Sequence, residues 1–211
     1  MNNISKILHD HYQSTFFQHG PTVQGVDWGN KQDNLDLRYS KMLEVIEPQD
    51  RNINTRFLDV GCGYGGLYEY SLFNGFNINY TGVDIVQSMM IHAQKTFPNA
   101  HFECHDILDY RPEQMFDYVV CNGILTQKLT ASIQEMESYS KALIRKLYSL
   151  CKKGIAFNLM SSKVNFTVNN LFYKSPVEML SFCLNEITSY VKIDHSYGLY
   201  EYTVYLYRDE I

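Results

Sequence analysis

Phe57-Leu-Asp-Val-Gly-Cys-Gly-Tyr-Gly-Gly-Leu67 is the stretch that decides the fold of this chain. A short apolar run, interrupted only by Asp59, leads into four glycines within six residues, and a helix-like pattern follows over residues 67–73. A buried strand that feeds a glycine turn and then a helix brings backbone N–H groups and a helix N-terminus against a polar ligand. Glycine is needed there because a side chain would block the ligand and because such turns require φ values that other residues avoid. The stretch therefore predicts a ligand-binding strand–turn–helix unit.

Strand and helix patterns alternate along the rest of the chain. The expected strands are 56–60, 78–83, 101–104, 116–121, 154–159, 188–193 and 200–207. The expected helices are 1–17, 35–46, 66–74, 86–96, 133–150 and 176–185. This alternation favours an α/β fold with a doubly wound, mostly parallel sheet, and the last two strands must be antiparallel because no helix fits between them. We expect one compact domain over 51–211, covered by an N-terminal helical cap over 1–50, with an irregular insert over 160–174.

Composition and charge exclude several classes of protein. The chain has 211 residues and a net charge of −5 with no basic run, which argues against a nucleic-acid partner. Its five cysteines are odd in number, widely spaced and without a C-x-x-C pair, so neither a zinc site nor a disulfide framework is expected. The N-terminus lacks the apolar core of a signal peptide and no window is long enough for a membrane span. We therefore expect a soluble cytoplasmic protein.

Acidic and small polar residues follow the expected strands one after another. They are Asp59 with Gly61, Asp84, Asp106, and Cys121-Asn122-Gly123. Ligands of doubly wound sheets bind beyond the carboxyl ends of the strands, and an acid about twenty residues after the glycine turn suits ribose hydroxyls. An NAD-binding domain of an oxidoreductase also fits the glycine spacing and Asp84, but it has no comparable need for Asp106. Two simpler readings remain open: a glycine turn without a ligand, and Asp84 and Asp106 as helix N-caps.

The set Asp59-x-Gly61-x-Gly63, Asp84, His105-Asp106-Ile107 and 117–123 resembles the motifs of the class I S-adenosylmethionine-dependent methyltransferases, in order and spacing, over residues 55–208. The resemblance implies a seven-stranded Rossmann-like sheet with an inserted antiparallel last strand, and S-adenosyl-L-methionine as cofactor. By position, Asp84 holds the ribose and Asp106 takes the adenine amino group. The other cofactor-contacting positions are Asp59 near the methionine ammonium, Gly61, Cys62 and Gly63 at the turn, Ile85 and Ile107 beside the adenine, and Asn122 and Gly123 at the methionine end.

Catalytic groups are harder to predict, because methyl transfer to an activated sulfonium needs mainly alignment and desolvation. If a general base is used, the weak candidates are His11, His19 and His105. The pair His9 and His11 with His19 could also bind a metal, but exposed or capping roles are favoured and no metal is predicted. Arg38 is expected either to pair with the cofactor carboxylate or to lie on a solvated helix face.

The acceptor is expected to be a small molecule. Cys121-Asn-Gly-Ile124 differs from the Asn/Asp-Pro-Pro-aromatic tetrapeptide of enzymes that methylate exocyclic amines of nucleobases or glutamine. The N-terminal region, with Trp28 as a lid or a staple, and the 160–174 insert are available to cover a substrate pocket. The N-terminal region and 197–202 look like those of some stand-alone bacterial methyltransferases. A monomer or a homodimer is expected, and a catalytically silent cofactor-binding protein is the further alternative.

Overall fold

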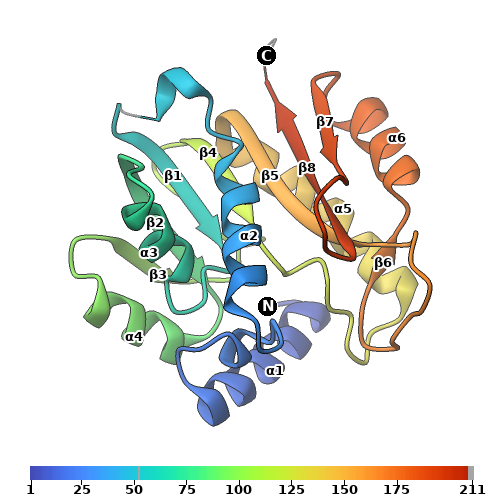
Figure 1. Ribbon diagram of the computed structural model, residues 1–211, viewed down its shortest axis with the longest axis horizontal. Coiled ribbons are helices and arrows are strands. Elements are labelled where there is room, and N and C mark those ends of the chain that lie inside the picture. Colours follow the sequence, from blue (N-terminus) through green and yellow to red (C-terminus); the bar gives the residue numbers. More distant parts are fainter. Residues whose placement is uncertain (52, 209–211) are drawn as a thin grey trace.

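A twisted sheet with helices on both faces organises residues 1–51 and 53–208, which are those that the computed structural model describes (Figure 1). Its strands are β1 (Thr55–Val60), β2 (Ile78–Asp84), β3 (His101–Cys104), β4 (Phe116–Cys121), β5 (Cys151–Ser161), β6 (Tyr173–Lys174), β7 (Val191–Asp194) and β8 (Glu201–Tyr207). The α-helices are α1 (Asn3–His19), α2 (Gln32–Leu43), α3 (Gly66–Phe73), α4 (Gln87–Thr96), α5 (Ile133–Leu150) and α6 (Pro176–Glu186). Short 3₁₀ helices, η1 (Gln24–Val26) and η2 (Pro48–Asp50), flank α2.

The strand order is β3-β2-β1-β4-β5-β8-β7, with β6 paired to the end of β5. Strands β1 to β5 are parallel neighbours, whereas β8 lies antiparallel between β5 and β7. The predicted doubly wound sheet with an inserted antiparallel last strand is therefore confirmed. The order reverses at β1, which has β2 on one side and β4 on the other, and this reversal opens a crevice at the carboxyl ends of the strands.

Several element bounds differ from the prediction. Helix α2 lies three residues earlier than 35–46, and β7 begins at Val191 instead of at 188. Strand β5 is longer than 154–159 at both ends, because Cys151 pairs with Phe116 of β4 and its last residues pair with β6. The insert at 160–174 contains the two-residue strand β6, which pairs with Met160 and Ser161. Such a short strand has no sequence period of its own, so only its neighbour reveals it.

Alternating side chains divide the core between the two faces of the sheet. On β1, Phe57 packs with α2, α3 and α4, while Leu58 and Val60 pack with α1, α5 and α6. The sheet is apolar on both faces because helices cover both, as expected of a parallel sheet. Neighbouring residues of one strand therefore pack against helices on opposite faces of the sheet.

Helix starts follow the sequence signals closely. Ser132 caps α5 by accepting from the Glu135 N–H, and the Glu135 carboxylate accepts from the Ser132 N–H, which completes a capping box. Ser175 caps α6 by accepting from the Glu178 N–H, with Pro176 in the first turn. These caps set where α5 and α6 leave the sheet.

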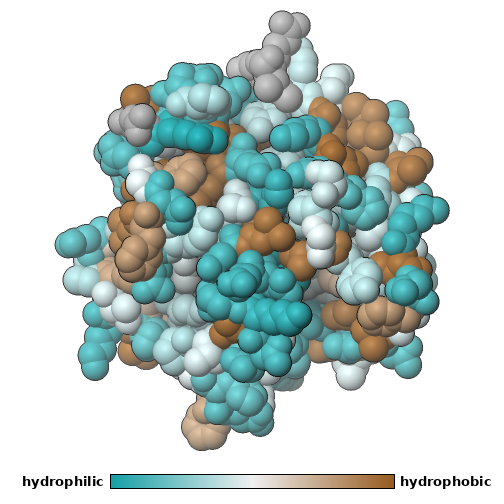
Figure 2. Space-filling view, in the orientation of Figure 1, coloured by the Kyte–Doolittle hydropathy of each residue, from teal (hydrophilic) through white to brown (hydrophobic). Residues whose placement is uncertain are grey.

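The N-terminal region has two parts with different roles. Helix α1 runs along the carboxyl edge of the strands, whereas α2 crosses one face of the sheet (Figure 1). Ile4 and Leu8 of α1 are buried in the cluster that contains α5, and Leu35 and Met42 of α2 are buried in the opposite cluster. On the face seen in Figure 2, hydrophilic side chains predominate over α2 and α1 with smaller hydrophobic groups among them, and further hydrophobic groups lie over α6 and on the side of α3.

Within residues 1–51 and 53–208, no helix has the length and apolar character needed to cross a membrane. The same residues contain no cluster of three or more His, Cys, Asp or Glu side chains placed to hold a metal ion. All five cysteines are free thiols.

Candidate functional site

The glycine turn after β1 lies against the end of β2. The N–H groups of Gly61 and Cys62 both donate to the Val83 carbonyl, at 2.8 and 3.3 Å. Gly61 has a φ of +74°, and a Cβ there would lie 2.7 Å from the Ile124 side chain. Glycine is therefore required both by backbone conformation and by close packing. The turn brings its backbone to the point where the strand order reverses.

A partly open cavity lies at this point, with about 70 Å³ of free space. Its walls come from α1, from η1 and the loop before α2, from the ends of β1, β2, β3 and β4, and from α4 and α5. The lining residues are Ser5, Leu8, Tyr12, Val26, Trp28, Val60, Gly61, Gly63, Val83, Asp84, Ile85, Met89, His105, Asp106, Ile107, Asn122, Ile124 and Tyr139. Seven of the predicted cofactor-contacting residues are among them: Gly61, Gly63, Asp84, Ile85, Asp106, Ile107 and Asn122.

Asp84 joins the glycine turn to the second strand. One carboxylate oxygen accepts from the Gly63 N–H and the other from the Val86 N–H, each at 2.9 Å. Burial raises the pKa of Asp84, and these backbone hydrogen bonds offset part of that rise. Asp84 is not the N-cap of α4, because that position is Val86 and it makes no side-chain cap bond. Each carboxylate oxygen has a further lone pair, so Asp84 can still accept from a ligand.

Asp106 presents an unused acceptor to the cavity. Its Oδ1 accepts from the Leu108 N–H at 3.1 Å, whereas its buried Oδ2 has no hydrogen-bond partner in the described part of the chain. A buried polar atom without a partner costs free energy unless a ligand or water satisfies it. Ile85, which follows β2, and Ile107, which follows β3, also line the cavity. Carboxylate and apolar walls together suit a flat base with an exocyclic amine.

Asn122 and Gly123 form the turn after β4. The buried Asn122 Oδ1 lines the cavity and likewise lacks a hydrogen-bond partner among the residues described. The Gly123 N–H donates to Asn158 Oδ1 at 2.8 Å, and the ring of Trp28 packs against Gly123 so closely that a Cβ would lie 2.6 Å from it. The turn is thus fixed from two sides and leaves Asn122 free to bind a ligand.

Asp59, Cys62 and Gly123 do not line the cavity. The Asp59 carboxylate is buried and accepts from the Tyr80 hydroxyl at 2.6 Å, and burial raises its pKa to about 7. The predicted contact of Asp59 with a ligand ammonium stays a prediction, because the hydrogen bond that Asp59 makes here is to Tyr80 of β2. Cys62 packs its thiol near Met90 Sδ, at 3.9 Å, and so acts as a core residue.

Arg38 has a partner that neither sequence reading named. It forms a buried ion pair with Glu201, with Nε and Oε1 2.6 Å apart, and its guanidinium stacks on Trp28 at 3.9 Å. The expected solvated helix face is wrong, because only 12% of the Arg38 side chain is exposed. Arg38 does not line the cavity, so pairing with a ligand carboxylate there is not what this geometry offers.

The three histidine candidates are separated. His105 lines the cavity, and its Nε2 lies 3.4 Å from Glu103. His11 binds Asp27 at 2.8 Å outside the cavity wall, and His19 ends α1 on the exposed surface. His105 is therefore the candidate base that the structure places at the site.

Sequence reasoning missed the wall that α1 and α5 supply: Ser5, Leu8, Tyr12 and Tyr139. The periodicity of α1 showed a buried face that includes Leu8 and Tyr12, but periodicity does not say what a face packs against. Burial raises the pKa of Tyr12, so its hydroxyl stays protonated and serves as a donor.

A family model described as a methyltransferase domain matches residues 57–154. The "Putative methyltransferase Rv1506c" of Mycobacterium tuberculosis (strain ATCC 25618 / H37Rv) is 31% identical over 151 residues, which cover 69% of this chain and 89% of that protein.

Two solved structures share the fold at low identity. Magnesium protoporphyrin IX methyltransferase (ChlM) from Synechocystis PCC 6803, with bound S-adenosylmethionine, has a TM-score of 0.68 at 16% identity and 99% coverage of both chains. Haemonchus contortus phosphoethanolamine N-methyltransferase 1, in complex with phosphoethanolamine and S-adenosylhomocysteine, has a TM-score of 0.65 at 11% identity, covering 98% of this chain and 50% of that one. The glycine turn, the strand order and the sequence similarity agree, and the chain belongs to the class I S-adenosylmethionine-dependent methyltransferases.

Proposed function

We propose that this protein transfers a methyl group from S-adenosylmethionine to a small-molecule acceptor. One observation carries the proposal: Asp84 and the unpartnered oxygens of Asp106 and Asn122 face the same cavity at the carboxyl ends of β2, β3 and β4. Along the sheet they follow in the order Asp106, Asp84 and Asn122, which matches the order of adenine, ribose and methionine in the cofactor. An NAD-dependent oxidoreductase, the alternative from sequence, gains no support from Asp106.

The residues present fit the cofactor in chemistry. Asp84 would accept hydrogen bonds from the ribose, and Asp106 Oδ2 from the adenine amino group. Ile85 and Ile107 would flank the adenine, and Asn122 would face the methionine end. The cofactor supplies an electrophilic methyl group on a sulfonium, so the task of this chain is to orient the acceptor and exclude water.

We expect the N-terminal segment to move outward when the cofactor enters. The free space of about 70 Å³ in the cavity is below the roughly 300–1,000 Å³ of ligand pockets. Leu8 and Tyr12 of α1 form part of the wall, and α1 lies along the carboxyl ends of the strands (Figure 1). We therefore expect α1 to act as the mobile cover of the site.

Two proteins with this fold support a small acceptor: one is a methyltransferase of magnesium protoporphyrin IX and the other a methyltransferase of phosphoethanolamine. The net charge of −5 gives no basic surface for a nucleic-acid backbone. If the acceptor must lose a proton, His105 is the candidate, since the Tyr12 hydroxyl stays protonated.

Calorimetric titration with S-adenosylhomocysteine tests the proposal. We expect wild type to bind, and Asp84→Asn to weaken binding by about 1.5–3 kcal/mol through loss of charge-assisted hydrogen bonds. The control is Asp50→Asn, because Asp50 is a buried acid that bonds to Tyr118 and Lys153 and does not line the cavity.

Equal affinity in wild type and Asp84→Asn contradicts the assignment of Asp84, and absence of binding in wild type contradicts the proposed function. Transfer of a radioactive methyl group to members of a metabolite library would then separate an enzyme from a silent cofactor-binding protein.

A further inference from the structure

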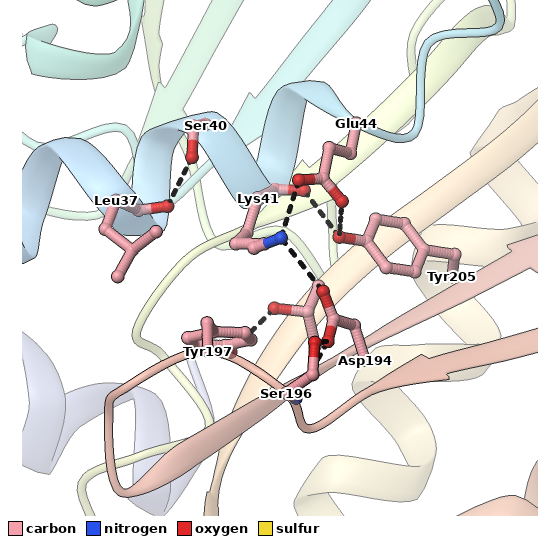
Figure 3. Close-up of polar contacts among 9 residues, drawn as sticks. Leu37, Ser40, Lys41, Glu44, Asp194, Ser196, Tyr197 and Tyr205 are labelled. Atoms are coloured by element: carbon pink, nitrogen blue, oxygen red, sulfur yellow. Dashed lines mark hydrogen bonds and ion pairs between the residues drawn. The ribbon is translucent and has the colours of Figure 1, made fainter.

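Two basic residues of α2, one turn apart, bind the two ends of the hairpin loop at 195–200. Lys41 Nζ lies 2.9 Å from Asp194 Oδ2 at the end of β7, and Arg38 Nε lies 2.6 Å from Glu201 Oε1 at the start of β8. Figure 3 shows the Lys41 half of this arrangement, with Glu44, Asp194 and Tyr205 around the ammonium group. Both ion pairs join α2 to the hairpin, but the residues around the Arg38 pair differ from those around the Lys41 pair.

The Lys41 pair contacts residues of its own helix and of the hairpin, including the Tyr197 ring, whose centroid lies 5.5 Å from Lys41 Nζ. Asp194 is further bound by the backbone and hydroxyl of Ser196, and the Tyr205 hydroxyl donates to Glu44. None of these residues lines the cavity. This half of the arrangement therefore docks α2 on the hairpin.

The Arg38 pair continues to the cavity along two routes. On one route, Glu201 Oε2 accepts from Asn158 Nδ2 at 2.6 Å, and Asn158 Oδ1 accepts from the Gly123 N–H at 2.8 Å. On the other route, the Arg38 guanidinium stacks on Trp28 at 3.9 Å, and Trp28 packs on Gly123. Both routes meet at the turn that carries Asn122.

The burial of this group argues against a purely structural link. Glu201 and Asn158 are 0% and 1% exposed. Burying a carboxylate costs free energy even when it is paired, and apolar residues would dock α2 at least as well. Arg38 Nε and Glu201 Oε1 have no hydrogen bond among the described residues and face each other only as an ion pair, but the two hydrogen bonds of Asn158 are made and fix one arrangement of the turn that Asn158 contacts.

We propose that Arg38, Glu201 and Asn158 are positioning residues for the methionine end of the cofactor site, holding Trp28 and the Asn122–Gly123 turn in the geometry that binding requires. This inference rests on the proposed function. Glu201 orients the Asn158 amide so that its oxygen faces Gly123, and Arg38 presses Trp28 against the same glycine. The Asn122 oxygen then meets the ligand without reorganisation.

The double variant Arg38→Met/Glu201→Gln tests this inference, because it removes both charges together and leaves neither buried alone. Trp28 is the one tryptophan of the chain, so its fluorescence reports directly on this position. We expect the double variant to fold, its Trp28 emission to shift to longer wavelength, and its affinity for S-adenosylhomocysteine to fall at least about tenfold.

Lys41→Met is the matched control, since it breaks the other ion pair of the same helix. We expect it to lower the melting temperature while Trp28 emission stays unchanged and affinity stays within about twofold. Arg38→Lys is the second variant: it keeps a positive charge opposite Glu201 but loses the flat guanidinium, and it should shift Trp28 emission and weaken binding even if the double variant does not fold.

Wild-type affinity and emission in the double variant or, should that variant not fold, in Arg38→Lys would overturn the inference. So would an equal loss of affinity in Lys41→Met, because the pair would then only dock the helix. Failure of the proposed function looks different: wild type itself would not bind S-adenosylhomocysteine.

Discussion

Gly123 is constrained both by its positive φ and by the Trp28 ring that packs against it. Its φ is +98°, and a Cβ built on it would lie 2.6 Å from Trp28 Cζ2. We expect Gly123→Ala to destabilise the fold by about 1–3 kcal/mol and to displace Trp28, which weakens binding of S-adenosylhomocysteine. Urea unfolding and calorimetric titration measure the two effects.

Gly75→Ala is the control for that substitution, because Gly75 has a φ of +71° but open space around its Cα. It should lose stability through backbone strain alone and bind S-adenosylhomocysteine as wild type does. Equal binding by Gly123→Ala would show that Trp28 does not have to rest on Gly123.

Asp59 gives the stability of this protein a pH dependence of unusual sign. Burial raises its pKa to about 7, against about 3.9 in an unfolded chain, and the hydrogen bond from Tyr80 offsets only part of the rise. Between pH 4 and 7 the unfolded state therefore binds fewer protons than the native state, so this group lowers stability as pH rises. We expect Asp59→Asn to gain stability relative to wild type across that window, by up to about 4 kcal/mol, in urea unfolding at pH 5 and 8. A difference that does not change with pH would contradict the assignment.

At the scale of elements, the contact between α2 and the β7–β8 hairpin has the opposite dependence. Burial alone would raise the pKa of Asp194, but hydrogen bonds from Ser196 and Lys41 outweigh it and lower the pKa to about 2 (Figure 3). The stabilisation is complete above the unfolded pKa of about 3.9 and is lost as pH falls through about 2.

Asp194→Asn should therefore cost about 1–2 kcal/mol at pH 6, and this cost should shrink below pH 4. Urea unfolding of both proteins at pH 6 and at pH 3 measures it. A cost that stays constant with pH would mean that the charge on Asp194 does not hold α2 on the hairpin.

The helix starts show why some elements can be read from sequence. Ser132 with Glu135, and Ser175 with Pro176, are signals carried by residues three apart or closer, and α5 and α6 begin where the sequence predicts. Strand β6 and the extension of β5 carry no such local signal, because their backbone groups pair with residues far along the chain.

For the whole molecule, ligand binding should raise the melting temperature. A ligand that binds only the folded state at a hundred times its dissociation constant adds about 2.7 kcal/mol, which is about 5–10 °C for a chain of this size. We expect this shift with S-adenosylhomocysteine and none with NAD. A shift with NAD alone would favour the oxidoreductase.

A site residue could be predicted from sequence only where its position in the sheet, and not a distant partner, places it at the site. The strand ends that carry Asp84, Asp106 and Asn122 were predictable, because parallel strands in this order place their carboxyl ends at one edge. Arg38 was not, because its partner Glu201 lies 163 positions away and only the antiparallel insertion of β8 brings them together. The wall from Ser5, Leu8, Tyr12 and Tyr139 was missed for the same reason.

The sequence by itself determined the alternation of strands and helices, the glycine turn and the acids that close the strands. These follow from backbone conformation and hydrophobic period, which act over a few residues. Only the tertiary structure decided that Asp59 faces Tyr80, that Arg38 pairs with Glu201 and that α1 covers the cavity. A buried side chain takes the partner that packing places beside it, and packing joins segments whose separation along the chain carries no local signal.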